Sequence, residues 1–432
     1  MATFNYVFRF SRALNQDFGN IYAYMEWRYT THRPLGMEEA TKKLKQGETS
    51  TALNSPAEAD IVRTDTVRVG SVTRVEGDLS WGRMTEGKID NWRYWGVYDG
   101  HSGWATSSIL RNHLHKYVGR KLDQLSAEDL DDYGAIEAAI KSAFTELDDE
   151  IVSDGLAAIY EPIPQAEAMC RIAPSSSGSC VLLALYNPER STLHVAGAGD
   201  SRAVLCRQKQ DENGDWVSIP LSVDHSSTNP DERARIKAEH PGEDRLFSAI
   251  GRFLGSEVTR SFGDNRQKWP REALEDWKNG FFGRVYNSNI QTPPYSTALP
   301  DVRNIQVQPG DVLILGTDGF WNHVSNEDAV YCVQLWIEAQ AKDRANNLEQ
   351  AENVDLAEVI STPEKDPERN MYPYNWEMER EAFIAEHDNI ATHLVQNAFG
   401  GKERDLFCSV MSLLPPDSKE ARDDVTVIVV LF

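Results

Sequence analysis

Short apolar runs rich in β-branched residues recur along the chain, separated by longer polar or helical segments. Such runs are typical of strands buried in a core, and they lie at residues 62–75, 95–98, 181–186, 192–197, 202–207, 312–317 and 425–430. Apolar spacing and charge predict helices at residues 37–46, 105–119, 128–156, 230–240, 327–347 and 376–399. Because the strands fall in blocks with helices between them in pairs, we expect a layered sandwich of helices and antiparallel sheets. A doubly wound fold would need tighter alternation of strand and helix.

The same pattern divides the chain into an N-terminal arm or helical extension, residues 1–61, and one large domain, residues 62–432. Insertions into that domain are expected near residues 266–300 and 330–402. The first contains four prolines and is predicted to be irregular, and the second includes an acidic, poorly patterned stretch at residues 349–370.

Composition narrows the class of protein. With 432 residues, of which 41% are hydrophobic, the chain is long enough for a large core. A net charge of −23 argues against nucleic-acid binding, because phosphate repels an acidic surface. No apolar run approaches the roughly 18 residues of a membrane span. The five cysteines are odd in number and form no C-x-x-C pair, which favours reduced thiols over disulfides or zinc.

Three of the predicted strands end or begin at an aspartate. Residues 95–98 lead into Asp99, residues 312–317 lead into Asp318, and Asp423 comes just before residues 425–430. A single Asp-Gly pair is more often a turn. Three carboxylates fixed at strand ends are suited to converge on hard cations, which prefer oxygen ligands.

Neighbouring residues extend this candidate metal site. A fourth carboxylate is expected from the turn that holds Glu76, and the backbone carbonyl of Gly100 can reach an ion bridged by Asp99. A water held between two such ions becomes a nucleophile near neutral pH. His101 can then protonate a departing alkoxide, although a lone histidine is more often structural. The Gly199-Asp200 turn is expected to bring Asp200 near the other carboxylates.

Seven motifs occur here in the order found in the metal-dependent protein phosphatases of type 2C, so the chain resembles that family from about residue 67 to residue 432. The motifs are Tyr98–Gly103, Ser177–Ser179, Gly199–Val204, Asp224-His225, Thr259–Asp264, Thr317–Trp321 and Arg422–Val427. Further segments resemble mitochondrial pyruvate dehydrogenase phosphatases, in the style of fungal members: Glu239–Pro241, Arg245-Leu246, Lys268-Trp269, Thr292–Pro300 and Asn397–Gly401.

The resemblance implies an α+β fold, a four-layer α-β-β-α sandwich of two antiparallel sheets flanked by helix pairs, with helical or irregular insertions. It also implies two Mg²⁺ or Mn²⁺ ions and hydrolysis of phosphoserine and phosphothreonine by a metal-activated water. The implied roles are metal binding for Glu76, Asp99, Gly100, Asp318 and Asp423, general acid for His101, and part of a weak third ion site for Asp200.

This chain departs from the family pattern at three places. Gly77 stands where an aspartate usually follows the ligand glutamate, and Asp78 is the possible substitute. Val72 stands where many members carry a phosphate-gripping arginine, which leaves Arg74 as the candidate for contact with the substrate phosphate. Asn322 replaces a common acid, which predicts a weak third ion site.

The sequence is compatible with two functions of different class. The first is an active serine/threonine phosphatase acting on a phosphoprotein, such as the E1α subunit of pyruvate dehydrogenase. The alternative is a pseudophosphatase, a scaffold that binds phosphoproteins without turnover. A metal-dependent nuclease is disfavoured by the acidic charge. The first sixteen residues lack acids and carry Arg9 and Arg12, which is a transit-type feature but equally fits an ordinary N-terminal arm. With the resemblance to mitochondrial phosphatases, the expected location is the mitochondrial matrix or intermembrane space, and the cytoplasm is the alternative. The sequence does not define an oligomeric state.

Overall fold

The computed structural model describes residues 62–67, 70–76, 82–89, 91–210, 214–287, 289–349, 377–387, 389–413 and 421–432. For residues 62–76 and 343–349 the description extends to the backbone alone. The expected N-terminal extension, the helix predicted at residues 37–46 and most of the acidic stretch lie outside the described residues.

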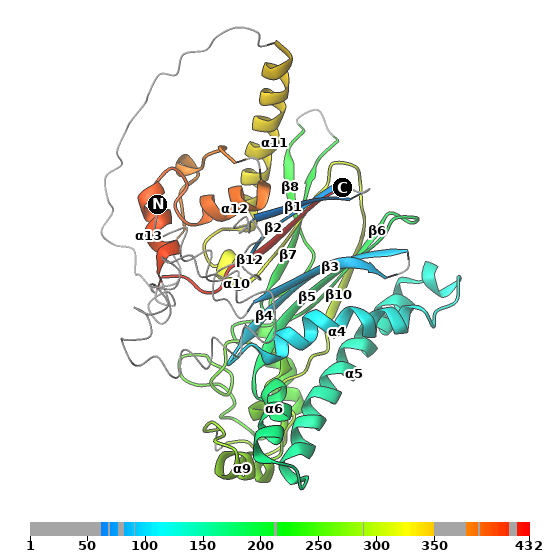
Figure 1. Ribbon diagram of the computed structural model, residues 1–432, viewed down its shortest axis with the longest axis vertical. Coiled ribbons are helices and arrows are strands. Elements are labelled where there is room, and N and C mark those ends of the chain that lie inside the picture. Colours follow the sequence, from blue (N-terminus) through cyan, green and yellow to red (C-terminus); the bar gives the residue numbers. More distant parts are fainter. Residues whose placement is uncertain are drawn as a thin grey trace, which may run out of the picture. The chain divides into compact units, whose positions relative to one another are not determined.

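Two sheets form the centre of the described domain (Figure 1). The first sheet has the strand order β1 (Val62–Val67), β2 (Gly70–Glu76), β12 (Thr426–Leu431), β11 (Val312–Gly316), β7 (Arg202–Gln208), β8 (Trp216–Pro220). The second has the order β10 (Asp301–Gln306), β6 (Thr192–Ala198), β5 (Gly178–Asn187), β4 (Trp92–His101), β3 (Arg83–Ile89), and the short β9 (Phe262–Gly263) pairs with β5. All pairings between these named strands are antiparallel.

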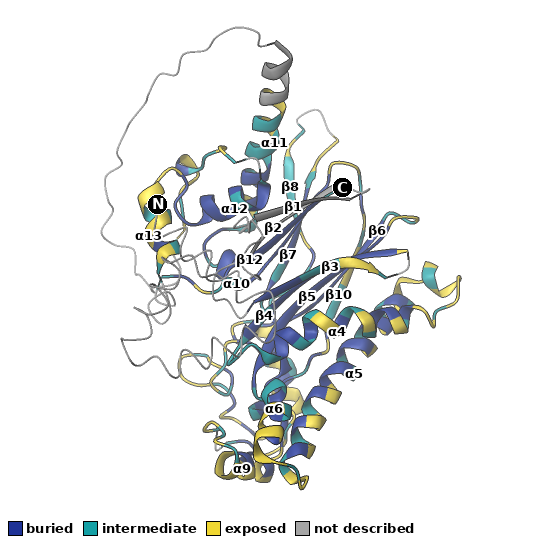
Figure 2. Cartoon of the chain, viewed as in Figure 1, coloured by how far each residue is buried: buried dark blue, intermediate teal, exposed yellow. Residues whose placement is uncertain are grey.

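The core between the sheets follows from alternation along the strands. In β4 the side chains of Trp95 and Val97 point inward, and in β11 those of Leu313 and Leu315 do the same. Because successive side chains on a strand point to opposite faces, the other set is free to meet the helices. Strand β5 is buried along its whole length, as expected for a central strand covered on both faces (Figure 2).

Helices cover the outer faces of both sheets, as Figure 1 shows. The second sheet is covered by α4 (Ala105–Leu122), with α5 (Tyr133–Tyr160) and α6 (Gln165–Ser176) packed beside it. The first sheet is covered by α11 (Asn326–Glu349) and α12 (Ile390–Ala398). The arrangement confirms the predicted α+β class with two antiparallel sheets and flanking helices. The other helices are α7 (Pro230–Glu239), α8 (Asn265–Lys268), α9 (Arg271–Gly280), α10 (Asp318–Trp321), α13 (Arg404–Ser412) and the 3₁₀ turns Asp129–Asp131 and Arg380–Ala382.

Two local predictions were wrong. Residues 267–300 are not uniformly irregular, because α9 lies within them and packs Ala273, Leu274 and Trp277 into a small core. The predicted helix at 376–399 is helical in its last part, α12, and residues 383–387 before it are extended or irregular. Asn389 caps α12 by accepting hydrogen bonds from the backbone of Ala391 and Thr392, which fixes the start of the helix there.

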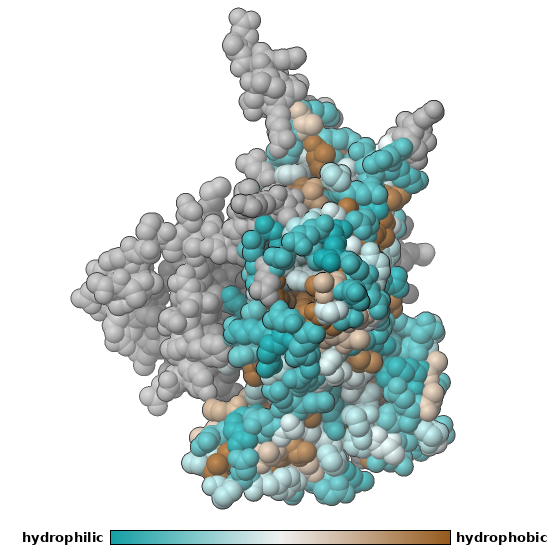
Figure 3. Space-filling model, turned by 90° about the vertical axis from the view of Figure 1, so that its right-hand side faces the viewer, coloured by the Kyte–Doolittle hydropathy of each residue, from teal (hydrophilic) through white to brown (hydrophobic). Residues whose placement is uncertain are grey.

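The surface is predominantly hydrophilic on the face shown in Figure 3, with small scattered apolar areas. Within the described part of the chain, no helix combines the length and apolar character needed to cross a membrane.

Candidate active site

Strand β4 carries the first group of predicted site residues. It continues through Asp99, Gly100 and His101, which lie opposite Cys180, Ser179 and Gly178 of β5. We expected the strand to end before Asp99, so pairing extends three residues further than predicted. The extra pairs hold these residues in a ladder of hydrogen bonds, which is a more rigid setting than a turn.

The first sheet supplies two further aspartates at the same end of the sandwich. Strand β11 ends at Gly316, and Asp318 opens the single-turn helix α10. The Thr317 hydroxyl donates to the carbonyl of Asp424 at 2.9 Å, which ties this turn to the segment before β12 that contains Asp423. A Cβ on Gly319 would lie 2.3 Å from the same carbonyl oxygen, so a glycine is required for the close approach.

The aspartates interact electrostatically, as their pKa values show. Burial raises the pKa of Asp99 well above its ordinary value, and the charges of Asp318, Asp423 and Asp200 raise it further. The pKa of Asp318 is raised in the same way by burial and by Asp200 and Asp423. Burial is also the main cause that raises the pKa of Asp200. The structure therefore brings together four carboxylates that the sequence singled out, from both sheets.

This donor set fits a divalent cation in its chemistry. The four side chains offer only oxygen atoms, and their mutual repulsion would be relieved by positive charge between them. Among the described residues, however, no three acidic, histidine or cysteine side chains already stand in a complete cation-binding arrangement. Glu76 ends β2 opposite Thr426, and Arg74 lies two residues earlier opposite Ile428. The side chains of both lie outside the description.

His101 has a partner in Asp264, the last residue of the Thr259–Asp264 motif. Its Nε2 lies 2.6 Å from the Oδ2 atom of Asp264, and the Ser261 hydroxyl donates to the same carboxylate. Burial lowers the pKa of His101, but the charge and hydrogen bond of Asp264 outweigh it, so the net pKa is raised. Burial raises the pKa of Asp264, but His101, Ser261 and Lys268 bring it down to about 2. A Cβ on Gly178 would lie 2.1 Å from Nε2 of His101, so this glycine makes room for the pair.

A buried ion pair holds the loop that carries Asp264. Lys268 donates to Asp148 of α5 at 2.6 Å and to the carbonyl of Ser261 at 2.7 Å. The backbone N–H of Gly263 donates to the other oxygen of Asp148 at 2.8 Å. Asp264 itself has a positive φ of 53°, a left-handed conformation that needs such support. The Lys268-Trp269 segment noted in the sequence thus acts on the site by fixing this loop.

Two arginines of the inserted segment also lie near His101. Arg266 is close enough for its charge to oppose protonation of His101. Arg284 donates to the carbonyl of Ser102 at 3.3 Å. These cations were missed because nothing in the local sequence around residues 266–284 indicates which way the insertion folds. Asn322 lies four residues after Asp318, on the same side of α10, and its N–H donates to the carbonyl of Asp318 at 2.8 Å.

Two cavities outlined by described residues lie away from the carboxylates. One, of about 610 Å³, is formed by α5 and the residues Lys268, Trp269 and Pro270. The other, of about 490 Å³, lies at the far end of the strands. Neither of these two cavities contains a member of the carboxylate cluster.

The chain belongs to the protein phosphatase 2C family, whose model matches residues 73–354. A protein phosphatase 2C homolog of Schizosaccharomyces pombe is 34% identical over 92% of this chain and 86% of its own length. Mitochondrial pyruvate dehydrogenase phosphatase 1 of Saccharomyces cerevisiae is 33% identical over 78% of this chain, and human mitochondrial pyruvate dehydrogenase phosphatase 2 is 30% identical over 76%. The match spans 62% and 60% of the lengths of these two proteins.

A solved structure, the serine-threonine phosphatase 2C of Toxoplasma gondii, is 17% identical with a TM-score of 0.47, covering 85% of this chain and 98% of that one. The predicted resemblance to the family is confirmed by the family match and the curated relatives.

Proposed function

We propose that this protein hydrolyses phosphoserine and phosphothreonine in a mitochondrial matrix protein, with the E1α subunit of pyruvate dehydrogenase as the first candidate substrate. The observation that carries the catalytic part is the set of four carboxylates gathered beside the His101–Asp264 pair. The substrate part is supported by the names of the yeast and human relatives, which are mitochondrial pyruvate dehydrogenase phosphatases.

In this proposal the carboxylates of Asp99, Asp318 and Asp423 would hold two Mg²⁺ or Mn²⁺ ions, and Glu76 and the carbonyl of Gly100 would complete the set. Bound divalent ions supply an activated water and neutralise charge on the phosphoryl group. These aspartates lie on or next to strands of both sheets, so the packing of the two sheets would set the distances between them. Asp200 would belong to a third, weaker site, which the neutral amide of Asn322 would weaken further.

The histidine supplies the proton that the leaving serine or threonine oxygen needs. Because Nε2 of His101 is bound to Asp264, Nδ1 is the nitrogen free to face the substrate. The raised pKa keeps the imidazolium form to higher pH, and the carboxylate stabilises it. After Nδ1 gives up its proton, Nε2 keeps its hydrogen bond to Asp264, so the ring stays oriented.

Positive charge for the substrate phosphate comes from arginines. Arg74 is the candidate from the sequence, and Arg266 is a second candidate because its charge acts on His101. An arginine pairs with phosphate oxygens through two parallel N–H groups, which also orients the phosphoryl group.

A scaffold without turnover is the alternative, and the departures from the family pattern at Gly77, Val72 and Asn322 favour it. It gives no reason for four mutually repelling aspartates, three of them half-buried, nor for a histidine held by the buried carboxylate of Asp264. We therefore favour the active enzyme.

The test is dephosphorylation of the phosphorylated E1 component by the purified full chain, compared with an unrelated phosphoserine protein, in Mn²⁺ and in EDTA. We expect faster phosphate release from E1, and release that requires the metal. Equal rates on both proteins would refute the substrate but not the activity, and no release from either would refute both. A tagged full-length protein found in the cytoplasm would contradict the matrix location.

A further inference from the structure

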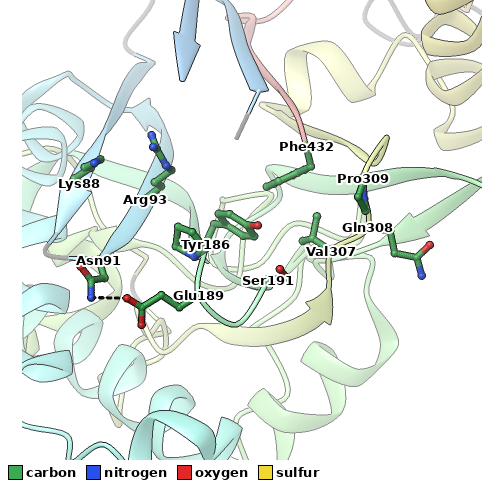
Figure 4. Close-up of a pocket in the computed structure, with 11 residues that line it drawn as sticks. Lys88, Asn91, Arg93, Tyr186, Glu189, Ser191, Val307, Gln308, Pro309 and Phe432 are labelled. Atoms are coloured by element: carbon green, nitrogen blue, oxygen red, sulfur yellow. Dashed lines mark hydrogen bonds between the residues drawn. The ribbon is translucent and has the colours of Figure 1, made fainter. Parts of the chain in front are cut away.

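A pocket of about 490 Å³ opens at the end of the sandwich opposite the candidate active site (Figure 4). Strand pairing places it there, because Arg93 lies opposite Tyr186 at one end of β4 and His101 lies opposite Gly178 at the other. Eight residues of extended strand separate Arg93 from His101, which is roughly 26 Å. The pocket is therefore separate from the carboxylate cluster and is not a substrate subsite of it.

Two positive charges stand side by side on its wall. Lys88 of β3 and Arg93 of β4 are direct register partners, and both lie on the face of the second sheet that points toward the first. Like charges opposite each other on neighbouring strands are destabilising. Neither forms an ion pair with a described residue. The acid in the pocket lining, Glu189, accepts a hydrogen bond from Asn91 at 3.1 Å instead.

Arg93 is the more informative of the two cations. It is only 9% exposed, and its Nε has no hydrogen-bond partner among the described residues. A guanidinium offers five N–H donors in a rigid fork, and a buried donor such as this Nε–H is costly to leave without a partner. Arg93 is therefore prepared to receive an anion from outside the described chain.

The rest of the wall is largely apolar. Tyr186 and Phe432 lie with their rings 5.0 Å apart, and Val307 and Pro309 continue this surface, as Figure 4 shows. A volume of this size lies in the range of small-molecule sites, which combine an apolar lining with a few placed polar groups. A carboxylate matches the planar fork of arginine, and a flat apolar body matches the rings.

We propose that this pocket binds a small organic carboxylate with a flat apolar body, its carboxylate on Arg93 and Lys88. The site goes beyond the proposed phosphatase function and does not depend on it.

The test is calorimetric titration of the full chain with 2-naphthoate, and with 2-naphthamide as the uncharged match. We expect saturable one-to-one binding of the acid and at least tenfold weaker binding of the amide. Arg93→Met should weaken binding of 2-naphthoate by roughly 10- to 100-fold, the range for a charge-assisted hydrogen bond. Arg303→Met, which removes an exposed arginine of β10 outside the pocket, should leave binding unchanged.

Arg93→Met is first checked for an unchanged circular dichroism spectrum. If it fails to fold, Lys88→Met replaces it, with an expected loss of about two- to fivefold because Lys88 is exposed. Binding should persist in Asp99→Asn. The proposal is overturned by absence of saturable binding, by equal affinity for acid and amide, by an unchanged affinity in the folded arginine variant, or by loss of binding in Asp99→Asn.

Discussion

Replacing Asp264 with asparagine tests whether this residue positions His101 for proton transfer. The substitution keeps the size of the side chain and removes its charge, which lies 2.6 Å from Nε2 of the histidine. The pKa of Asp264 falls from 3.8 to about 2 in the folded protein, which corresponds to roughly 2–3 kcal/mol of favourable interaction. His101, Ser261 and Lys268 share this free energy. Because the folded pKa lies below the unfolded value, the stabilisation is fully present above about pH 4 and is lost as pH falls toward 2.

At neutral pH Asp264 is fully ionised, so the Asp264→Asn variant should lose its whole interaction with His101. Since about 1.4 kcal/mol corresponds to a factor of ten, we expect kcat on a phosphoserine peptide to fall by roughly 10- to 50-fold in Asp264→Asn. The leaving group of p-nitrophenyl phosphate is a stable anion that needs no proton, so its turnover should fall less than about threefold. A structural loss would reduce both substrates alike.

The pH profile gives a second, independent readout. Without Asp264, the burial that lowers the pKa of His101 is no longer offset. Activity on phosphoserine requires the protonated ring, so in the variant it should decline at lower pH than in the wild type. Asp149→Asn, which removes an exposed acid next to Asp148 on α5, is the matched control. Equal losses on both substrates, or a pH profile that does not move, would refute the positioning role.

Three further predictions concern other parts of the domain. Arg266→Met should raise KM for a phosphoserine peptide by roughly 10- to 100-fold with a smaller change in kcat, because the variant cannot make the proposed charge-assisted contact to the phosphate. An unchanged KM would exclude this contact. Asn322→Asp should move the Mg²⁺ activation midpoint to lower concentration, because a charge is added near Asp318 and Asp200; a midpoint that stays or rises would place residue 322 away from the ions. His194 is fully buried with neither ring nitrogen hydrogen-bonded to a described residue, and burial lowers its pKa to about 4. The free energy of unfolding of the wild type should therefore fall by about 2–3 kcal/mol between pH 7 and pH 4.5, and this loss should be absent in His194→Phe. An equal fall in the two proteins would contradict this.

The sequence predicted the sheets and their aspartates because short-range patterns carry that information. Strands such as β11 are continuous apolar runs, and Asp318 follows directly in the chain. The order of the motifs then identified the family, which the comparisons confirm.

What the sequence could not provide is the pairing of residues far apart in the chain. His101 and Asp264 are 163 residues apart, and their contact depends on β9 pairing with β5 and on the buried Lys268–Asp148 ion pair. Helix α9 was missed because the prolines around it dominated the prediction. Pro270 is in fact its N-cap, next to the first helical position where proline is favoured, and the spacing of Ala273, Leu274 and Trp277 was a usable helical signal.

The roles of Glu76 in metal binding and of Arg74 in phosphate binding remain predictions from the resemblance. Their strand β2 is placed by its pairing with β12, which brings Glu76 to the same end of the sheet as Asp423. A Glu76→Gln variant therefore belongs with the aspartate variants in any titration of metal activation.

The most direct test of the central claim is phosphate release from a phosphoserine peptide, measured as a function of Mn²⁺ concentration. The account predicts no release in EDTA, and activation by Mn²⁺ in the wild type and in the exposed-acid control Asp149→Asn. At limiting Mn²⁺ the rate of release should fall by at least about 100-fold in Asp99→Asn, Asp318→Asn and Asp423→Asn. Each of these variants removes one charged ligand of a hard cation. Full turnover by Asp99→Asn at limiting Mn²⁺, or release by the wild type in EDTA, would contradict the assignment of the carboxylate cluster as the catalytic metal centre.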